Sequence, residues 1–299
     1  MRFANLNAQW QGQTPVMRGA VMMVASTVAF AVMHASVRIV SDELEAFQIA
    51  FFRNAFGLLF IFPLLLRGGL AQLKTAQLGL HALRGVVNVV AMLLFFTAVT
   101  ITPLAKVTAL SFTAPIFAAA LSVLFLGERF RAPRWAAIGF GFVGMLIVLR
   151  PGLAVIEPGA IMALVAAALW SVAMILIKIL SRTESSLVIV AWMGIFLCAF
   201  SFLPALWVWQ WPSLTAWGWL AFVGLTGTLA QITLSQSLKE TDPTAVLPFD
   251  FLKLIWTSLL AMWLFGEIPD RFTWIGAGVI FASGLFIAHR ERRLAQAKR

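Results

Sequence analysis

One pattern occurs twice in this chain. The stretch from Thr102 to Pro151 contains a proline, a long apolar run, a Gly-Glu pair, a short basic turn, a tryptophan and a glycine-rich apolar run. The same order returns between Asp242 and His289, about 140 residues further along the chain. Each copy is long and apolar enough for two membrane-spanning helices joined by a short turn. The sequence therefore predicts a duplicated membrane protein.

The composition excludes an ordinary soluble domain. Of the 299 residues 61% are hydrophobic and 11% are charged, and the mean hydropathy is +0.93. A soluble domain carries about 25% charged residues, so this chain could not cover its surface with polar groups. The net charge of +10 does not indicate nucleic acid, because the basic residues gather in short turns and in the tail. The single cysteine, Cys198, lies in an apolar run and argues against a disulfide framework.

We predict an all-α integral membrane protein with ten transmembrane helices. A span needs about 20 mostly apolar residues. The predicted spans are 18–40, 46–66, 82–101, 104–126, 133–150, 158–181, 186–208, 216–238, 244–265 and 272–289. Their connections are short and rich in proline and glycine, and they leave no room for a soluble domain.

Lysine and arginine predict the orientation. They are concentrated at the N-terminus, in every second connection and in the tail RERRLAQAKR, so both termini should be cytoplasmic. Arg84, at the cytoplasmic end of the third span, is expected to be a further orientation charge. Residues 1–17 show no cleavable signal peptide, which predicts that the first span is retained. The expected location is the bacterial inner membrane.

Two halves of five spans each must enter the membrane from opposite sides, because five is an odd number. We expect a first repeat at 18–150 and a second, inverted repeat at 151–289, flanked by a cytoplasmic segment at 1–17 and a basic tail at 290–299. Inverted repeats around a central cavity are typical of secondary transporters, since exchanging the conformations of the two halves moves the opening from one side to the other.

The run TPLAKVTALSFTAPIFAAALSVLFLGERFRAPRWAAIGFGFVGMLIVLRPG and its partner DPTAVLPFDFLKLIWTSLLAMWLFGEIPD resemble the drug/metabolite transporter superfamily, in its ten-span EamA-type branch. The resemblance covers about residues 18–290, and the YddG-type amino-acid exporters look like near relatives. It implies a carrier without an ATPase subunit, whose cavity is formed mainly by spans 1, 3, 4, 6, 8 and 9. Members move amino acids, other metabolites and drugs.

Charged residues inside spans are costly and are candidates for function. Asp250 and Lys253 lie three residues apart in the ninth span, and Lys253 is roughly 15 Å into that span at about 1.5 Å per residue. They either contact substrate or a proton in the cavity, or form a structural ion pair. His34 could titrate near neutral pH or could be a packed, hydrogen-bonded residue. Arg38 is expected to snorkel to the outer surface, and Arg53 either faces the bundle or snorkels.

Uncharged residues complete the set of candidates. The aromatic residues could form a wall of the cavity or belong to the core, and the polar ones offer hydrogen bonds: Asn88, Phe112, Trp170, Gln231, Phe249 and Trp256. Pro115 and Pro248 lie inside spans, where each removes a backbone donor and could serve as a hinge. Glu128 and Glu267 follow spans and are expected to cap or pack. Two glycine sets should allow close helix packing: Gly139, Gly141, Gly144 and Gly276, Gly278, Gly284.

These patterns favour a secondary transporter of small metabolites, with amino-acid export as the preferred function. A carrier of drugs, nucleosides or organic cations is the alternative, and a channel is a weaker one because no continuous polar stripe is visible. The chain shows no nucleophile elbow, metal-ligand spacing or P-loop, so we expect neither an enzyme nor a pump, and no cofactor or metal. The expected partners are a small-molecule substrate and the lipid bilayer, with no nucleic acid. The oligomeric state is left open, a monomer included.

Overall fold

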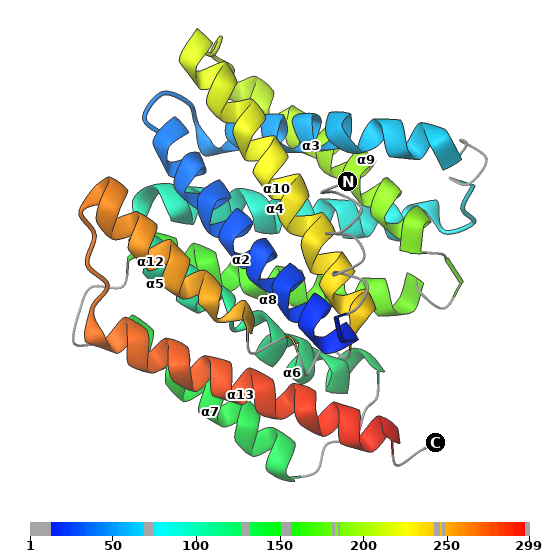
Figure 1. Cartoon of the computed structure of the whole chain (residues 1–299), viewed down its shortest axis with the longest axis vertical. Helices are drawn as coiled ribbons and strands as arrows, with labels where there is room; N and C mark the ends of the chain where they lie inside the picture. The colour runs from blue at the N-terminus through cyan, green and yellow to red at the C-terminus, as the bar shows by residue number, and fades with distance from the viewer. Residues whose placement is uncertain are drawn as a thin grey trace.

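The computed structural model describes residues 13–68, 74–126, 132–150, 157–180, 183–184, 186–241, 246 and 249–296. Within these ranges the ordered elements are α-helices (Figure 1). They are α2 (Pro15–Val40), α3 (Ala46–Gly68), α4 (Leu78–Ile101), α5 (Leu104–Ser111), α6 (Ala114–Leu126), α7 (Ala132–Leu149), α8 (Pro158–Leu180), α9 (Ser186–Trp207), α10 (Leu214–Glu240), α12 (Leu252–Phe265) and α13 (Arg271–Gln296). The all-α prediction is confirmed.

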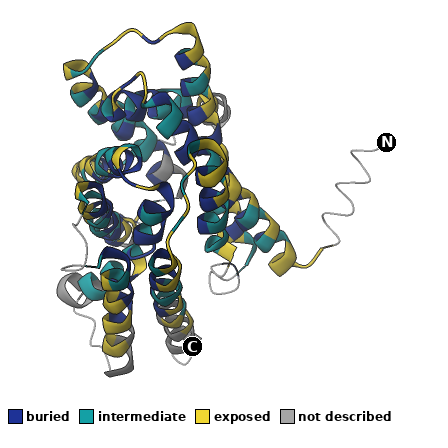
Figure 2. Ribbon diagram, turned by 90° about the vertical axis from the view of Figure 1, so that its left-hand side faces the viewer, coloured by how far each residue is buried: buried dark blue, intermediate teal, exposed yellow. Residues whose placement is uncertain are grey.

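Four of these helices are long and apolar enough to cross a membrane: α2, α4, α10 and the part of α8 from Pro158 to Ile177. Shorter apolar helical stretches lie in α3, α5–α6, α7, α9, α12 and α13. Figure 2 shows buried residues where helices face one another and exposed residues along the outside. Many exposed side chains are large and apolar, as a lipid environment requires. The count of ten spans stays a prediction.

Polar contacts gather at the two ends of the bundle. At one end, Glu43 accepts hydrogen bonds from Ser213, and Arg38 contacts Glu267; we call it the Arg38 end. At the other, the Arg18 end, Arg18 Nε lies 2.9 Å from Glu240 Oε2. Figure 1 shows that α2 begins and α13 ends at the Arg18 end. The described ends of the chain therefore lie on the same side of the bundle.

The packing of the helices joins the two halves of the chain. Helix α2 packs against α10, and α4 packs against α8. Helix α7 packs against α13, and Figure 1 shows these two side by side along one edge of the molecule. Each of these pairs combines a helix from before residue 150 with one from after residue 157. The core is thus built between the halves.

Glycines allow the close approach of α7 and α13. A Cβ atom on Gly144 would lie 2.9 Å from the Gly276 carbonyl oxygen, and one on Gly276 would lie 2.6 Å from the Gly144 carbonyl oxygen. Gly141 faces Ile116 and is equally tight. The packing role predicted for the glycines holds for these three positions. Among the described residues, nothing lies within 4 Å of a Cβ atom added at Gly139, Gly278 or Gly284.

The predicted fourth span is interrupted between α5 and α6. Phe112 donates its backbone N–H to Ala109, and Thr113 donates its own to Leu110, so the chain forms tight turns before α6 begins. Pro115 lies in the first turn of α6, where its missing N–H leaves no helical bond unmade. The break therefore precedes the proline, and a hinge at this joint stays a proposal. Pro248 lies outside the described residues.

Candidate functional site

Lys253 lies where four helical segments meet. It is in the first turn of α12, and its Nζ atom is 3.6 Å from Asp250 Oδ2. The same ammonium group lies 4.8 Å from the ring centre of Phe112, at the α5–α6 joint, and 6.0 Å from that of Phe30 on α2. Ring faces attract cations at these distances. The predicted Asp250–Lys253 pair therefore forms, with the aromatic rings of Phe30 and Phe112 beside the lysine.

The pair is held loosely. The Lys253 and Asp250 side chains are 16% and 27% exposed, and their 3.6 Å separation is longer than a hydrogen bond. Within the described residues neither side chain makes a hydrogen bond. A lysine carries three donors and a carboxylate about four acceptor sites, so both groups keep bonding capacity for a ligand.

A line of rings continues from Lys253 into the bundle. Phe30 stacks with His34 at 6.1 Å between ring centres, His34 lies 5.0 Å from Phe95 on α4, and Phe95 lies 5.0 Å from Trp170 on α8. His34 is buried, and its Nδ1 atom has no hydrogen-bond partner among the described residues. The predicted residues His34 and Trp170 are thus joined to the Asp250–Lys253 pair by Phe30 and Phe95, and Phe112 contacts Lys253 directly.

Phe112 also belongs to a second aromatic group. Its ring centre lies 5.8 Å from that of Phe251 and 6.2 Å from that of Phe281 on α13, and the Phe251 and Phe281 rings are 4.7 Å apart. These contacts connect the α5–α6 joint with the start of α12. The joint and the charged pair therefore share one packed surface.

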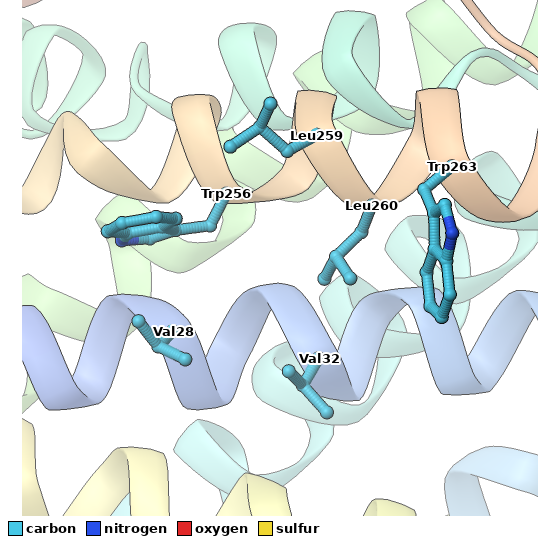
Figure 3. A pocket seen from close by; sticks show the side chains of 6 residues that line it. All are labelled: Val28, Val32, Trp256, Leu259, Leu260 and Trp263. Atoms are coloured by element: carbon cyan, nitrogen blue, oxygen red, sulfur yellow. The ribbon is translucent and has the colours of Figure 1, made fainter.

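Other predicted residues lie apart from this group. Within the described part of the chain, Asn88, Gln231 and Phe249 make no side-chain hydrogen bond or ring contact to it, and Phe249 is exposed. Trp256 lies one turn beyond Lys253 and lines an apolar groove between α2 and α12, with Val28, Val32, Leu259, Leu260 and Trp263 (Figure 3). Its indole N–H is buried without a partner in the described structure. A substrate role for these residues stays a prediction.

Three cross-half ion pairs close the Arg38 end. Arg38 Nη2 lies 2.6 Å from Glu267 Oε1, Lys106 Nζ lies 3.0 Å from Glu157 Oε1, and Arg150 pairs with Asp270. Arg38 is therefore a paired residue, whereas the sequence predicted a snorkelling anchor. The other oxygen of Glu267 accepts the backbone N–H of Leu104 at 3.0 Å, which confirms its capping role. Glu128 lies outside the described residues.

Arg53 and Arg84 were not among the predicted site residues. Arg53 faces α10 from inside the bundle, where its guanidinium lies against Gly227. Arg84 was expected to set orientation, but it is 3% exposed and donates to the carbonyl of Ile189. The only sequence signal for Arg53 was its position inside an apolar run, which did not decide whether it faces the bundle or snorkels to the membrane surface. No group of three metal-ligating side chains occurs among the described residues.

The family is shown by a match to both halves. The model of the EamA-like transporter family matches residues 17–150 and again residues 157–288. The chain belongs to the EamA-like transporter family. The two family repeats correspond to the duplication seen in the sequence.

Curated relatives match most of the chain. An S-adenosylmethionine uptake transporter of Rickettsia conorii is 30% identical over 256 residues, or 86% of this chain and 87% of the relative. A riboflavin transporter of Vibrio cholerae is 31% identical over 289 residues, 95% of this chain and 97% of the relative. A pseudopaline exporter of Pseudomonas aeruginosa is 27% identical, over 92% of this chain and 97% of the relative. A protein of known crystal structure shares 18% sequence identity with this chain. The structural match covers 94% of this chain and 98% of that protein's chain, and its TM-score of 0.62 supports the fold.

Proposed function

We propose that this EamA-like protein is a secondary transporter that moves a small metabolite by alternating access between two inverted repeats. The packing supports the inversion. Helix α2 packs on α10, and their counterparts under the 140-residue offset, α8 and α4, pack on each other in the same way. Helices α7 and α13, which are counterparts themselves, also pack together. This exchange of contacts is what a pseudo-two-fold axis between the halves would produce.

An amino acid is the cargo that the site favours most. A zwitterion carries one ammonium and one carboxylate group. Lys253 could bind the carboxylate and Asp250 the ammonium, because both keep unused bonding capacity inside the membrane region. The rings of Phe30 and Phe112 would then surround the charged end of the ligand. This loosely held pair is the observation on which the proposed cargo rests.

Export is the proposed direction, across a bacterial inner membrane with both termini in the cytoplasm. The charge bias of the connections and the shared side of the two described chain ends support this orientation. A relative named for export and others named for uptake occur in the same family. A carrier of larger planar metabolites is the second candidate, favoured by the line of rings from Phe30 to Trp170. The riboflavin transporter among the relatives is consistent with it.

Transport by purified protein in proteoliposomes tests the proposal. The panel consists of leucine, glutamine, phenylalanine, riboflavin, a nucleoside and an organic cation, each with and without an imposed proton gradient. We expect saturable transport of amino acids without ATP. Transport of riboflavin or the nucleoside with no amino-acid transport would favour the second candidate, and ohmic single-channel currents would favour a channel.

A further inference from the structure

Arg53 is a second cation in the interior of the bundle. It is the eighth residue of α3, roughly 10 Å along the helix from its start at Ala46. A Cβ atom on Gly227 of α10 would lie 3.0 Å from Arg53 Nε, 3.3 Å from its Nη2 and 2.7 Å from the sulfur of Met33. Glycine at position 227 therefore leaves the space that the guanidinium occupies beside α2.

Asn54 holds the guanidinium in place. Arg53 Nη1 donates to Asn54 Oδ1 at 2.9 Å. The Asn54 amide nitrogen donates to the Leu197 carbonyl at 3.3 Å and to Ser201 Oγ at 3.2 Å, both on α9. Because Asn54 is buried and tied to another helix, its carbonyl oxygen fixes the orientation of Arg53. Asn54 is a positioning residue.

Arg53 has no carboxylate partner among the described residues. Its only hydrogen bond there is the one to Asn54, so most of its five N–H donors are unused. By contrast, Arg38, Lys106 and Arg150 each pair with an acid. An uncompensated cation in a membrane interior is expensive, and such a residue is a candidate ligand contact.

Arg53 and Lys253 both lie near the same stretch of α2. The Arg53 guanidinium and the Met33 sulfur both lie within 3.3 Å of the Cβ position at Gly227, and Lys253 lies over Phe30. Met33 and Phe30 are about 4.5 Å apart along the axis of α2. This region therefore contains two cations, Arg53 and Lys253, and one acid, Asp250.

We propose that Arg53 binds a second acidic group of the cargo, so that the preferred substrate is an amino acid with an acidic side chain. This rests on the proposed function above. Two cations and one carboxylate complement a ligand with two acidic groups and one ammonium group. Lys253 would bind the α-carboxylate, Asp250 the ammonium and Arg53 the side-chain acid. The planar guanidinium suits a carboxylate or a phosphate, which it can bind through two parallel hydrogen bonds.

Binding and transport with four amino acids test this assignment. L-glutamate and O-phospho-L-serine carry the second acidic group, as carboxylate and as phosphate, whereas L-glutamine and L-leucine lack it. We expect the wild type to bind at least one acidic ligand about tenfold or more tightly than glutamine, by calorimetry on the purified protein. Arg53→Gln should remove this preference, so that the acidic ligands and glutamine bind with similar affinity. Arg53→Lys should keep part of this preference, because lysine keeps the positive charge but lacks the planar guanidinium that can form two parallel hydrogen bonds.

Matched variants control for charge and for folding. Arg271→Gln removes one exposed positive charge at the Arg38 end and should leave the preference unchanged. Gly227→Ala should weaken the preference by displacing the guanidinium. If Arg53→Gln does not fold, the preference for acidic ligands over glutamine is compared between the wild type and the variants Arg53→Lys and Gly227→Ala.

Equal affinity of the wild type for glutamine and both acidic ligands overturns the assignment, as does an unchanged preference in folded Arg53→Gln. If leucine and glutamine are transported but Arg53 has no effect on selectivity, the proposed function stands and this inference fails. If no amino acid binds or is transported, the proposed cargo fails, and the assignment of Arg53 fails with it.

Discussion

Arg38 Nη2 lies 2.6 Å from Glu267 Oε1, and this contact ties the end of α2 to the end of α12. Arg38 Nη1 also donates to the Thr102 carbonyl at 3.1 Å, while Glu267 caps Leu104 at the start of α5. This ion pair and its hydrogen bonds thus link the end of α2, the α4–α5 connection and the α12–α13 connection at the Arg38 end. Both side chains are about one-fifth exposed, so solvent screens the pair less than it would at a fully exposed site.

Glu267→Gln should open this end. The variant loses charge-assisted hydrogen bonds worth about 2 kcal/mol, so states open at the Arg38 end become more populated. The measurement is thiol labelling of Thr108→Cys, on buried α5, after the single native cysteine is replaced by Cys198→Ser. Labelling should be faster with Glu267→Gln, and Arg38→Glu combined with Glu267→Arg should slow it again. Labelling rates that do not respond to either change would contradict a closing role.

Neutralising the central pair should impair transport. Lys253→Met and Asp250→Asn each remove one partner of the proposed zwitterion, and we expect about a tenfold to hundredfold loss of affinity from each. The double variant should be at least as impaired. If all three variants fold and transport at the wild-type rate, the site is elsewhere. If the double variant recovers what a single change abolished, the pair is a packing element.

Alanine at Gly144 or Gly276 should destabilise the α7–α13 contact. Each added methyl would meet a backbone carbonyl of the facing helix at under 3 Å, and backbone atoms cannot move aside without separating the helices. We expect a loss of about 1–3 kcal/mol, seen as a lower midpoint of thermal unfolding in detergent. Gly278→Ala is the matched control, because an added Cβ there meets nothing within 4 Å. A Gly276→Ala midpoint equal to that of the control would contradict the packing role.

The connection between α2 and α3 should be acid-sensitive. Two donors of Ser213, its backbone N–H at 2.6 Å and its hydroxyl at 2.8 Å, hold the pKa of the Glu43 carboxyl below its ordinary value of 4.5. A lowered folded-state pKa stabilises the protein above pH 4.5, and this stabilisation is lost as pH falls through the lowered value. The thermal midpoint of the wild type should therefore fall toward that of Glu43→Gln below pH 4.5.

The sequence predicted features that depend on local spacing. Asp250 and Lys253 lie three residues apart on one turn, so their pairing followed from the helix itself. The repeat of Pro, Gly-Glu and Trp predicted the duplication, which the family match confirms. Four helices of spanning length and composition agree with a membrane protein.

Features that depend on how the halves meet were not predictable. Arg38 was read as a snorkelling residue because its partner, Glu267, lies far along the chain. Arg84 and Arg53 looked like surface or undecided charges, because periodicity in an all-apolar helix does not show which face is inside. Phe95 gave no signal among 26 phenylalanines, and only the fold places it beside His34. The contact of Phe30 with His34, in contrast, follows from their four-residue spacing on one helix.

Phe112 occupies the joint between α5 and α6, and its ring lies against the Lys253 ammonium group. The joint keeps its backbone satisfied through local bonds to Ala109 and Leu110, so it can bend without presenting bare peptide groups to lipid. A solute that binds the Lys253 ammonium group must displace the Phe112 ring, which is part of the joint. Ligand binding would therefore be coupled directly to bending of the helix between α5 and α6.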